Sequence, residues 1–480
     1  MSNYDVTPQI DHTITNNSVP RYRLTRIPLN NLNSGTVPFL PTSQTLCEWK
    51  IPSNTAFNLS KSFITYQYTI PASAGNYTAV FENSFDFAQI FAGLGSGLGV
   101  CDLNYASRYV KAVKHLRSKM EEDFMSGNDE LHQFYKSNQP GVNNLYPVSL
   151  DGLTTGTTFA SPVNNLDSQQ LKFSSAPNVA LTVSRSIPLS IIYDTIFSVD
   201  RDLIMGSDFY IRFFTESLQR MAYYVPNPNA PSTGVVQINA GINATNMTLY
   251  LAQEMNLDIR SMLLEALARG SIKMSIPYTS VFRYSQSTNS SNSNLSLTLT
   301  RNYGRSLARM LYTVFNVNEL GNAAQDHSNC NGTRTATFQT ALNGRPLQDS
   351  VQACYNPYAT VNANIFSSAP QEFAQDWRGM REWIKGSSYQ NYAHYQSHWV
   401  WCDSWSVPSM VDESRKRPFY LNNDGLDLTQ GDQIYSIQSA CPGVNVTVNP
   451  NTNSSGSIQY LFPTFLRTLT IVPDGLIISA

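Results

Sequence analysis

Short segments in which apolar and polar residues alternate are the feature that most limits how this chain can fold. In residues 64–70, Ile64, Tyr66, Tyr68 and Ile70 are separated by single polar residues. A period of two directs alternate side chains to opposite faces of a β-strand, so such a segment predicts a strand with one buried face. The same alternation recurs in residues 179–183, 209–213 and 247–251. The chain therefore predicts an all-β fold.

A second series of strand-like segments follows a stretch that predicts a helix. Residues 261–269 have a helical pattern, and Gly270 is a suitable C-terminal stop because glycine readily adopts a positive φ. The later strand-like segments lie at residues 295–299, 311–317, 444–448 and 466–472. Because 480 residues exceed the roughly 100–200 residues of an ordinary domain, the two series predict two cores.

Each half contains a predicted helix within its longest gap between strands. The first has a candidate N-cap at Asn104 and an apolar stripe at helical spacing, formed by Tyr105, Tyr109, Val113, Leu116 and Met120. The second, residues 368–386, begins with a capping-box pattern and ends at Gly386. These matching positions suggest duplication of one unit of strands plus a helix.

Composition excludes several classes of protein. Charged residues make up 14% of the chain, against about 25% in ordinary domains. Lys plus Arg (32) nearly balances Asp plus Glu (34), and the net charge of −2 provides no overall field that attracts nucleic acid. A histone-like role is therefore excluded. Residues 1–12 lack the apolar core of a secretory signal, and no apolar run of about 18 residues predicts a membrane span.

The cysteines indicate a reducing compartment. They form no C-x-x-C pair, so neither a zinc knuckle nor a thioredoxin-type motif is predicted. We expect buried thiols at Cys47, Cys101, Cys330, Cys354, Cys402 and Cys441.

Residues 1–42 contain repeated prolines and the polar cluster 30–35, and they lack a periodic apolar face. We expect an extended N-terminal arm. Its three basic residues, Arg21, Arg23 and Arg26, are too few for the dense basic tail that binds a packaged genome directly.

Histidines and glycines provide motif-like patterns that fall short of known sites. His394 and His398 have the spacing of a zincin motif, but Tyr395 stands where that motif requires Glu, so structural histidines are the favoured interpretation. His327 and Cys330 lie close together in an Asn-rich segment that predicts a loop, not a catalytic pair. The spaced glycines Gly93, Gly95, Gly97 and Gly99 match no phosphate-binding loop and predict a turn or flexible strand.

Clusters of polar or aromatic residues have two interpretations each. A set of oxygen ligands could hold calcium but more simply predicts a turn: Asn422, Asn423, Asp424, Asp427 and Asp432. A basic side of the first helix predicts a solvated face, with nucleic acid or an acidic partner as the alternative: Arg108, Lys111, Lys114, His115 and Lys119. Five tryptophans suit a second core or a subunit contact: Trp377, Trp383, Trp399, Trp401 and Trp405. We predict no catalytic residue, cofactor or metal ion.

Three segments resemble parts of a known capsid protein family. Residues 56–64 (AFNLSKSFI) are similar to an opening strand pair, and residues 184–190 (SRSIPLS) and 202–213 (DLIMGSDFYIRF) are similar to late strands of a first jelly roll. With two strand sets and a polar arm, the chain resembles the double jelly-roll major capsid proteins of the tectivirus, adenovirus, virophage and giant-virus lineage. The resemblance implies two consecutive eight-stranded jelly-roll β-sandwiches with short helices in the long inter-strand loops. The expected division is an arm at residues 1–42, a first jelly roll at 43–257 and a second at 258–480.

The resemblance also implies a function. Such a chain would be a structural capsid protein, without enzymatic activity, that forms pseudo-hexameric homotrimers and tiles an icosahedral virion shell. Its expected partners are other copies of itself, neighbouring capsomers, and minor capsid and vertex proteins, with synthesis in the host cytoplasm or nucleus. The near-neutral charge favours a DNA-virus shell without sequence-specific nucleic-acid contact, and an internal membrane is compatible with it.

Two alternatives stay open at the level of sequence. One is a viral capsid protein with a single jelly roll, in which the second strand set decorates loops. The other is a carbohydrate-binding or hydrolytic all-β protein, for which two carboxylates would face each other in a cleft. The candidate carboxylates near tryptophan are Glu372, Asp376, Glu382 and Asp403.

Overall fold

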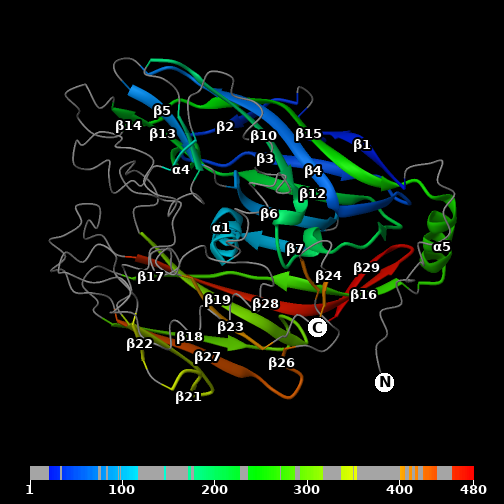
Figure 1. Ribbon diagram of the computed structural model, residues 1–480. Helices are drawn as coiled ribbons and strands as arrows, with labels where there is room; N and C mark the ends of the chain where they lie inside the picture. Colours follow the sequence, from blue (N-terminus) through cyan, green and yellow to red (C-terminus); the bar gives the residue numbers. More distant parts are fainter. Residues whose placement is uncertain are drawn as a thin grey trace.

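The protein is described by a computed structural model in which strands dominate (Figure 1). The structure describes residues 21–32, 35–73, 77–82, 85–95, 97, 99–116, 145–147, 171–174, 178–226, 236–270, 272–286, 292–316, 337–349, 351–353, 400–405, 410–412, 417–419, 425–440 and 457–479.

Two antiparallel sheets form the first sandwich. One has the order β1 (Tyr22–Pro28), β15 (Ile242–Glu254), β4 (Ala56–Ile70) and β10 (Leu181–Pro188), with β2 (Val37–Phe39) on β15 and β11 (Leu203–Ile204) on β4. The other has the order β3 (Leu46–Ile51), β12 (Phe209–Thr215), β6 (Phe87–Leu94) and β7 (Gly99–Asn104). The predicted strands at residues 64–70, 209–213 and 247–251 are confirmed, and the segment at 179–183 begins as a strand at Leu181.

A second pair of sheets forms the second sandwich. The first sheet has the order β16 (Ile272–Thr279), β28 (Ser457–Val472), β19 (Ser306–Asn316) and β23 (Val400–Ser404), with β17 (Phe282–Gln286), β26 (Leu426–Asp427) and β29 (Gly475–Ser479) at its sides. The other has the order β18 (Asn292–Leu299), β27 (Gln433–Ala440), β20 (Thr337–Leu342) and β21 (Arg345–Pro346), with β22 (Gln352–Ala353) on β20. The prediction of a single jelly roll is therefore wrong, because the second strand set builds its own sandwich.

Both sandwiches have the same strand order. When the eight main strands of each are counted along the chain, one sheet has the order first, eighth, third, sixth, and the other has second, seventh, fourth, fifth. This order is that of a jelly roll, in which strands far apart in sequence pair across the sandwich. The predicted fold class, two consecutive eight-stranded jelly rolls, is confirmed, and the shared order supports the predicted duplication.

Smaller elements extend this frame. A further sheet beside the first sandwich has the order β14 (Val236–Gln237), β13 (Ala222–Pro226), β5 (Tyr77–Glu82), β9 (Leu171–Ser174) and β8 (Leu145–Pro147). A hairpin pairs β24 (Met410–Asp412) with β25 (Arg417–Phe419). Short helices follow strands at η2 (Leu189–Ile191), η3 (Ile196–Ser198) and α4 (Leu218–Met221).

Part of the expected arm belongs to the first sandwich. Strand β1 pairs along its length with β15, and β2 pairs with the start of β15. At the start of β1, Arg21 forms ion pairs with Asp202 (2.7 Å) and Glu254 (2.7 Å). Residues 22–28 therefore supply the first of the eight strands, whereas residues 1–20 lie outside the described part of the chain. The division at residues 42 and 257 stays a prediction.

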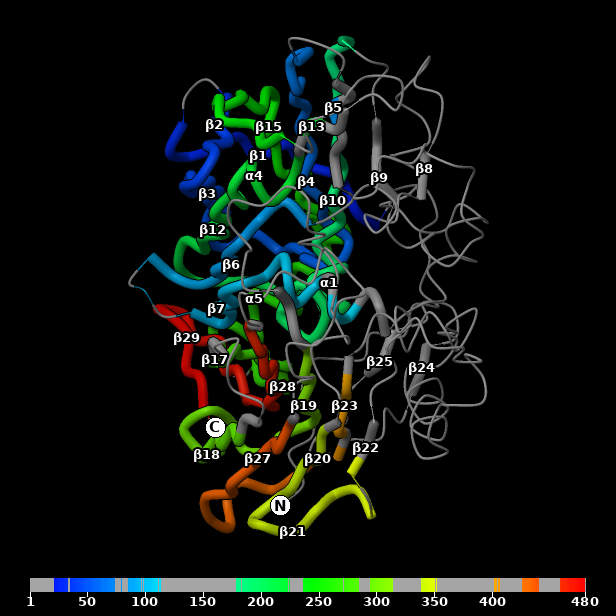
Figure 2. Tube along the Cα trace, turned by 90° about the vertical axis from the view of Figure 1, so that its left-hand side faces the viewer, coloured from blue at the N-terminus to red at the C-terminus, as the bar shows by residue number. Residues whose placement is uncertain are grey.

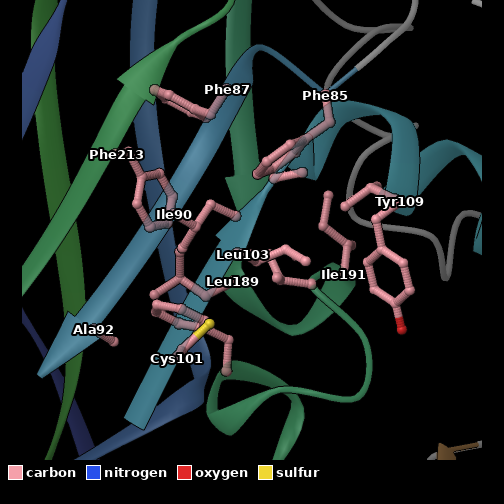
Figure 3. Packing of buried hydrophobic residues seen from close by; sticks show 14 of the residues in the cluster. Phe85, Phe87, Ile90, Ala92, Cys101, Leu103, Tyr109, Leu189, Ile191 and Phe213 are labelled. Atoms are coloured by element: carbon pink, nitrogen blue, oxygen red, sulfur yellow. The ribbon is translucent and has the colours of Figure 1, made fainter. Parts of the chain in front are cut away.

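The core of the first sandwich is rich in aromatic rings. Trp49 and Phe213 meet edge to face with 5.7 Å between ring centroids, and Phe87 approaches Phe213 at 4.9 Å. Figure 3 shows these phenylalanines beside Ile90 and Leu103, which point from strands β6 and β7 toward the η2 segment. Cys47 and Cys101 are buried free thiols, as predicted, and burial raises the pKa of each. Cys402 is also a buried free thiol.

Two of the predicted helices lie within the described residues. Helix α1 (Ala106–Leu116) buries Tyr109 and Val113 as expected, but Asn104 is the last residue of β7 and so is not its N-cap. Helix α5 (Leu257–Ala268) begins four residues before the predicted start, and the expected stop Gly270, with φ of 61°, follows its C-cap residue Arg269. The predicted helix at residues 368–386 lies outside the described residues.

The early start of α5 comes from its cap. The side chain of Asn256 accepts hydrogen bonds from the backbone N–H groups of Asp258 (2.9 Å) and Ile259 (3.4 Å). We expect Asn256→Ala to lower the free energy of unfolding by about 1 kcal/mol, because two helix donors lose their partner. Urea unfolding followed by circular dichroism measures this loss. Ser261→Ala, at an exposed position inside the same helix, is the control, and an equal loss in both variants would contradict the capping role.

Candidate functional site

The two sandwiches meet at an extended junction, with α1 between them (Figures 1 and 2). The first sandwich contributes α1, the η2–η3 segment and edge strand β7. The second contributes one face of the sheet that contains β16, β28 and β19. This sheet therefore has one face in its own core and the other against the first sandwich.

Five buried polar side chains cross the junction and are called the junction cluster. They are Tyr109 and Asp194 from the first sandwich and Thr279, Arg309 and Thr464 from the second, and each is at most 4% exposed. Arg309 forms an ion pair with Asp194 and donates to the Tyr109 hydroxyl at 2.7 Å. Tyr109 in turn donates to Asp194 Oδ2 at 2.8 Å.

The two threonines complete the junction cluster. Thr279 donates to the backbone oxygen of Asp194 at 2.9 Å and lies 3.0 Å from the Thr464 hydroxyl. Burial raises the pKa of Tyr109, so its hydroxyl stays protonated and keeps donating. A buried charge pair with satisfied hydrogen bonds adds little net stability over apolar residues, but it is costly to break. The junction cluster therefore favours one orientation of the sandwiches over others.

Aromatic packing surrounds the junction cluster. Tyr105 meets Tyr460 edge to face at 5.4 Å between centroids, and Tyr109 lies 5.3 Å from Phe462. Tyr460 and Phe462 project from the same face of β28 and stack at 5.7 Å. These rings bury apolar area on both sides of the junction, which makes the contact largely apolar around a polar centre.

At another point of the junction, the two backbones touch. A Cβ atom placed on Gly206 would lie 1.6 Å from the backbone oxygen of Pro473, in the turn between β28 and β29. Beside it, the Ser207 hydroxyl donates to the backbone oxygen of Asp474 at 3.3 Å. Only glycine allows this close approach at position 206.

A buried carboxylate also links the two sheets inside the first sandwich. Asp86, next to β6, accepts from Arg185 of β10 through both oxygens, at 2.8 Å each. Tyr66 of β4 donates to the same carboxylate. Burial raises the pKa of Asp86, and the Arg185 guanidinium opposes that effect. A bidentate arginine gives this contact a fixed geometry.

Asp403, the candidate acid of the hydrolase alternative, has a corresponding place in the second sandwich. It lies on β23 and accepts from Tyr435 at 2.7 Å, from Thr340 at 2.8 Å and from Trp401 at 3.1 Å. Tyr435 and Thr340 belong to the opposite sheet, and burial raises the pKa of the Asp403 carboxyl. Its oxygens are occupied by donors from the core, so the geometry describes a structural link between sheets. Glu372, Asp376 and Glu382 lie outside the described residues.

We expect Asp403→Ala to destabilise the protein strongly, because Tyr435, Thr340 and Trp401 lose a shared acceptor. Each buried donor left without a partner costs about 1–3 kcal/mol. The measurement is the midpoint of thermal unfolding by calorimetry. Asp432→Ala, at an exposed loop position, is the control, and a midpoint for Asp403→Ala equal to that of the control would contradict this account.

The remaining sequence candidates have varied outcomes. Gly93 and Gly99 lie opposite each other in paired strands β6 and β7, which agrees with the predicted turn or strand and not with a phosphate-binding loop. His327, Cys330, His394, His398 and residues 422–424 lie outside the described residues. Asp427 accepts from the Thr429 backbone and side chain at 2.8 and 2.6 Å, which is typical of a turn.

Among the described residues, no group of three or more His, Cys, Asp or Glu side chains is placed to hold a metal ion.

The solvated face expected on the first helix is wrong for Arg108. This residue is 4% exposed, because α1 packs between the sandwiches, where residues 106–110 are all buried. Trp401 is buried in the second core and meets Phe338 at 4.6 Å, as the core interpretation expects, whereas Trp377, Trp383 and Trp399 lie outside the described residues. None of the described helices has the length and hydropathy needed to cross a bilayer.

The sequence alone did not reveal the junction cluster. Its members come from distant parts of the chain, and Tyr109 and Arg309, which are in contact, are 200 residues apart. One usable signal was Arg309 itself, which stands between Ala308 and Met310 in a strand that has no other charged residue. A charged residue in such a strand needs a buried partner.

Comparisons with known proteins give likeness in structure. No family model matches the sequence, and no curated protein matches it. VP54 of PBCV-1, fitted into a cryo-EM reconstruction of the virophage Sputnik, matches with a TM-score of 0.51 and 10% identity over 96% of this chain and 98% of that chain. The Faustovirus major capsid protein matches with a TM-score of 0.46 and 9% identity over 96% of this chain and 92% of that one. The mavirus major capsid protein matches with a TM-score of 0.43 and 9% identity over 98% of this chain and 94% of that one.

The fold conclusion rests on the strand order together with the likeness to VP54, which extends along nearly the whole of both chains. Its two sandwiches share one strand order, and an edge of the first meets a face of the second. This chain therefore has the double jelly-roll fold of viral major capsid proteins.

Proposed function

We propose that this chain is a structural capsid protein that assembles as pseudo-hexameric homotrimers into an icosahedral virion shell. The observation that carries the proposal is the repetition of one jelly roll within a chain whose two copies are held in a fixed orientation. Three such chains place six similar sandwiches around one axis, which approximates a hexagonal tile.

The junction supports this role. A tile has to keep its shape while it contacts several neighbours, and the junction cluster together with the close backbone contact at Gly206 restricts movement between the sandwiches. The carboxylates Asp86 and Asp403 link the sheets within each sandwich in a similar way. These charged groups serve structure, which agrees with a protein that performs no reaction.

The proposal includes partners and location. We propose contacts with other copies, neighbouring capsomers, and minor capsid and vertex proteins in the virion, without sequence-specific nucleic-acid binding. The expected division into an arm (1–42), a first roll (43–257) and a second roll (258–480) is part of the same proposal, except that β1, which lies within the expected arm, supplies the first strand of the first roll.

Negative-stain microscopy of the purified full-length chain, combined with light scattering, tests the proposal. We expect hexagonal particles with the mass of three chains, and closed or sheet-like arrays at high concentration. A monomer at all concentrations, with no arrays under any assembly condition, would contradict it. Incubation with a panel of glycans is the parallel test of the carbohydrate alternative, for which binding or cleavage is the positive result.

A further inference from the structure

Helix α5 has an exposed side that carries no charged residue. One side of the helix is buried against the rest of the protein and holds Ile259, Leu263 and Leu267. Because a helix repeats every 3.6 residues, another side combines four exposed residues, which we call the α5 stripe: Leu257, Ser261, Leu264 and Ala268. Within it, Leu257 is 71% exposed and Leu264 is 40% exposed.

The charged residues of α5 lie beside the α5 stripe and not within it. Asp258, Glu265 and Arg269 follow one border, where Glu265 and Arg269 form an ion pair, and Arg260 lies on the other border. A solvated side of a helix normally carries charged or polar side chains. Two exposed leucines in an uncharged stripe therefore indicate a surface that another segment covers. Figure 1 shows α5 at one end of the molecule.

The start of β1 lies next to the start of α5. Strands β1 and β15 are antiparallel, with Tyr22 opposite Glu254, and the backbone N–H of Met255 donates to the backbone oxygen of Arg21 at 2.8 Å. Met255 is two residues before Leu257, the first residue of the α5 stripe. The point at which residues 1–20 attach to the first sandwich is therefore beside the α5 stripe, although those residues lie outside the described part of the chain.

One buried carboxylate fixes this arrangement. The side chain of Glu254 is 0% exposed, and its Oε2 atom accepts from Arg21 Nε at 2.7 Å. Its Oε1 atom accepts from the backbone N–H of Asn256 at 2.9 Å, and Asn256 is the N-cap of α5. Arg21 also pairs with Asp202 at 2.7 Å. The same group thus holds both Arg21 and the first turn of α5, so their relative position is fixed.

The segment before Arg21 has the length and composition to cover the α5 stripe. An extended chain spans about 3.3 Å per residue, so residues 14–20 reach about 23 Å. The 12 residues of α5 extend over about 18 Å. The segment supplies apolar side chains at Ile10, Ile14 and Val19, and Asp11 is its only acidic residue after position 5. A short tether gives an effective concentration in the millimolar range, so a small apolar contact suffices.

We infer that residues 10–19 bind the α5 stripe of the same chain, with Ile14 and Val19 against Leu257 and Leu264. The tether at Arg21 favours the stripe of the same chain over that of another copy, because no translational freedom is lost. The contact fastens the start of the chain to the helix that connects the two sandwiches. This inference does not depend on how copies of the chain assemble.

Hydrogen exchange measured by mass spectrometry on the full-length chain tests the inference. We expect amides of residues 10–19 to exchange about tenfold faster in the double variant Leu257→Ser, Leu264→Ser than in the wild type, because the contact loses its apolar side chains. Both replaced residues are exposed, and circular dichroism verifies that the fold is kept. The matched control is Met262→Ser, which removes a 42% exposed apolar side chain from another side of α5 and should leave the exchange unchanged.

A mixing experiment identifies the chain that supplies the stripe. The Leu257→Ser, Leu264→Ser variant is mixed with the variant Ile14→Ser, Val19→Ser, which has an intact stripe and a defective segment. If the mixture restores slow exchange to the intact segment, residues 10–19 bind another copy and the inference is wrong. It is also wrong if residues 10–19 exchange as fast in the wild type as in the stripe variant.

Vesicles of phosphatidylcholine and phosphatidylglycerol test a lipid surface as the occupant. Cosedimentation of the wild type but not of the stripe variant, with fast exchange of residues 10–19, would assign the α5 stripe to lipid and overturn the inference. Slow exchange of residues 10–19 in the wild type, lost in the stripe variant and not restored by mixing, is the result that supports it.

Discussion

Replacing Arg309 by methionine is expected to lower the free energy of unfolding by about 3–5 kcal/mol, because Asp194 then remains as a buried charge without its counter-ion. Arg309 is 2% exposed and Asp194 is 4% exposed, so water does not reach the carboxylate in the folded protein. Methionine, like arginine, has a long unbranched side chain. The loss in free energy of unfolding therefore reports the missing charge more than the missing volume. Urea unfolding monitored by tryptophan fluorescence and circular dichroism measures it.

Two further variants separate the charge from the packing. Arg309→Met combined with Asp194→Asn removes both charges, and we expect it to recover part of the loss, since interacting residues show coupling energies of about 0.5–3 kcal/mol. Tyr109→Phe keeps the ion pair and removes one hydroxyl, for which a loss of about 1–3 kcal/mol is expected. If the free energy of unfolding of Arg309→Met lies within about 1 kcal/mol of the wild-type value, the junction cluster does not hold the two sandwiches together.

Gly206→Ala is expected to be the second strongly destabilising change, with a loss of about 3 kcal/mol or more, at the upper end for overpacking. The new Cβ would lie 1.6 Å from the oxygen and 2.5 Å from the carbon of the Pro473 carbonyl. Because these are backbone atoms, no side-chain rotation relieves the overlap, and the two sandwiches have to separate at this point. The expected observation is a lower thermal midpoint together with faster proteolysis.

Gly475→Ala is the matched control for this change. It adds the same methyl group nearby, at the same junction, but its Cβ would lie 3.7 Å from Leu94 Cδ1, which is an ordinary contact distance. We expect the free energy of unfolding to change by no more than about 1 kcal/mol, because the added methyl group overlaps no backbone atom. Equal midpoints for the two alanine variants would show that the approach of Gly206 to Pro473 does not constrain the junction.

The strand segments were predictable because their signal is local. A side chain in a strand alternates between faces, so Ile64, Tyr66 and Tyr68 showed from sequence alone that one face of β4 is buried. The same reasoning failed for β1, whose residues are mostly exposed or half-buried at the edge of a sheet. Without an apolar period, residues 22–28 looked like part of an arm, although their pairing with β15 makes them a strand.

The sequence by itself indicated several of the strands and showed that there are two sets of them, because the period of two follows from burial of one face along a strand. It also indicated the helix ending at Gly270, because only glycine adopts a positive φ there without strain. Tertiary structure decided how the two sets meet. Arg108 carries no mark in the sequence that separates a solvated charge from a buried one, and the apolar neighbours of Arg309 indicate burial without identifying its partners. Their burial depends on partners that lie far away in sequence, and only folding brings those partners together.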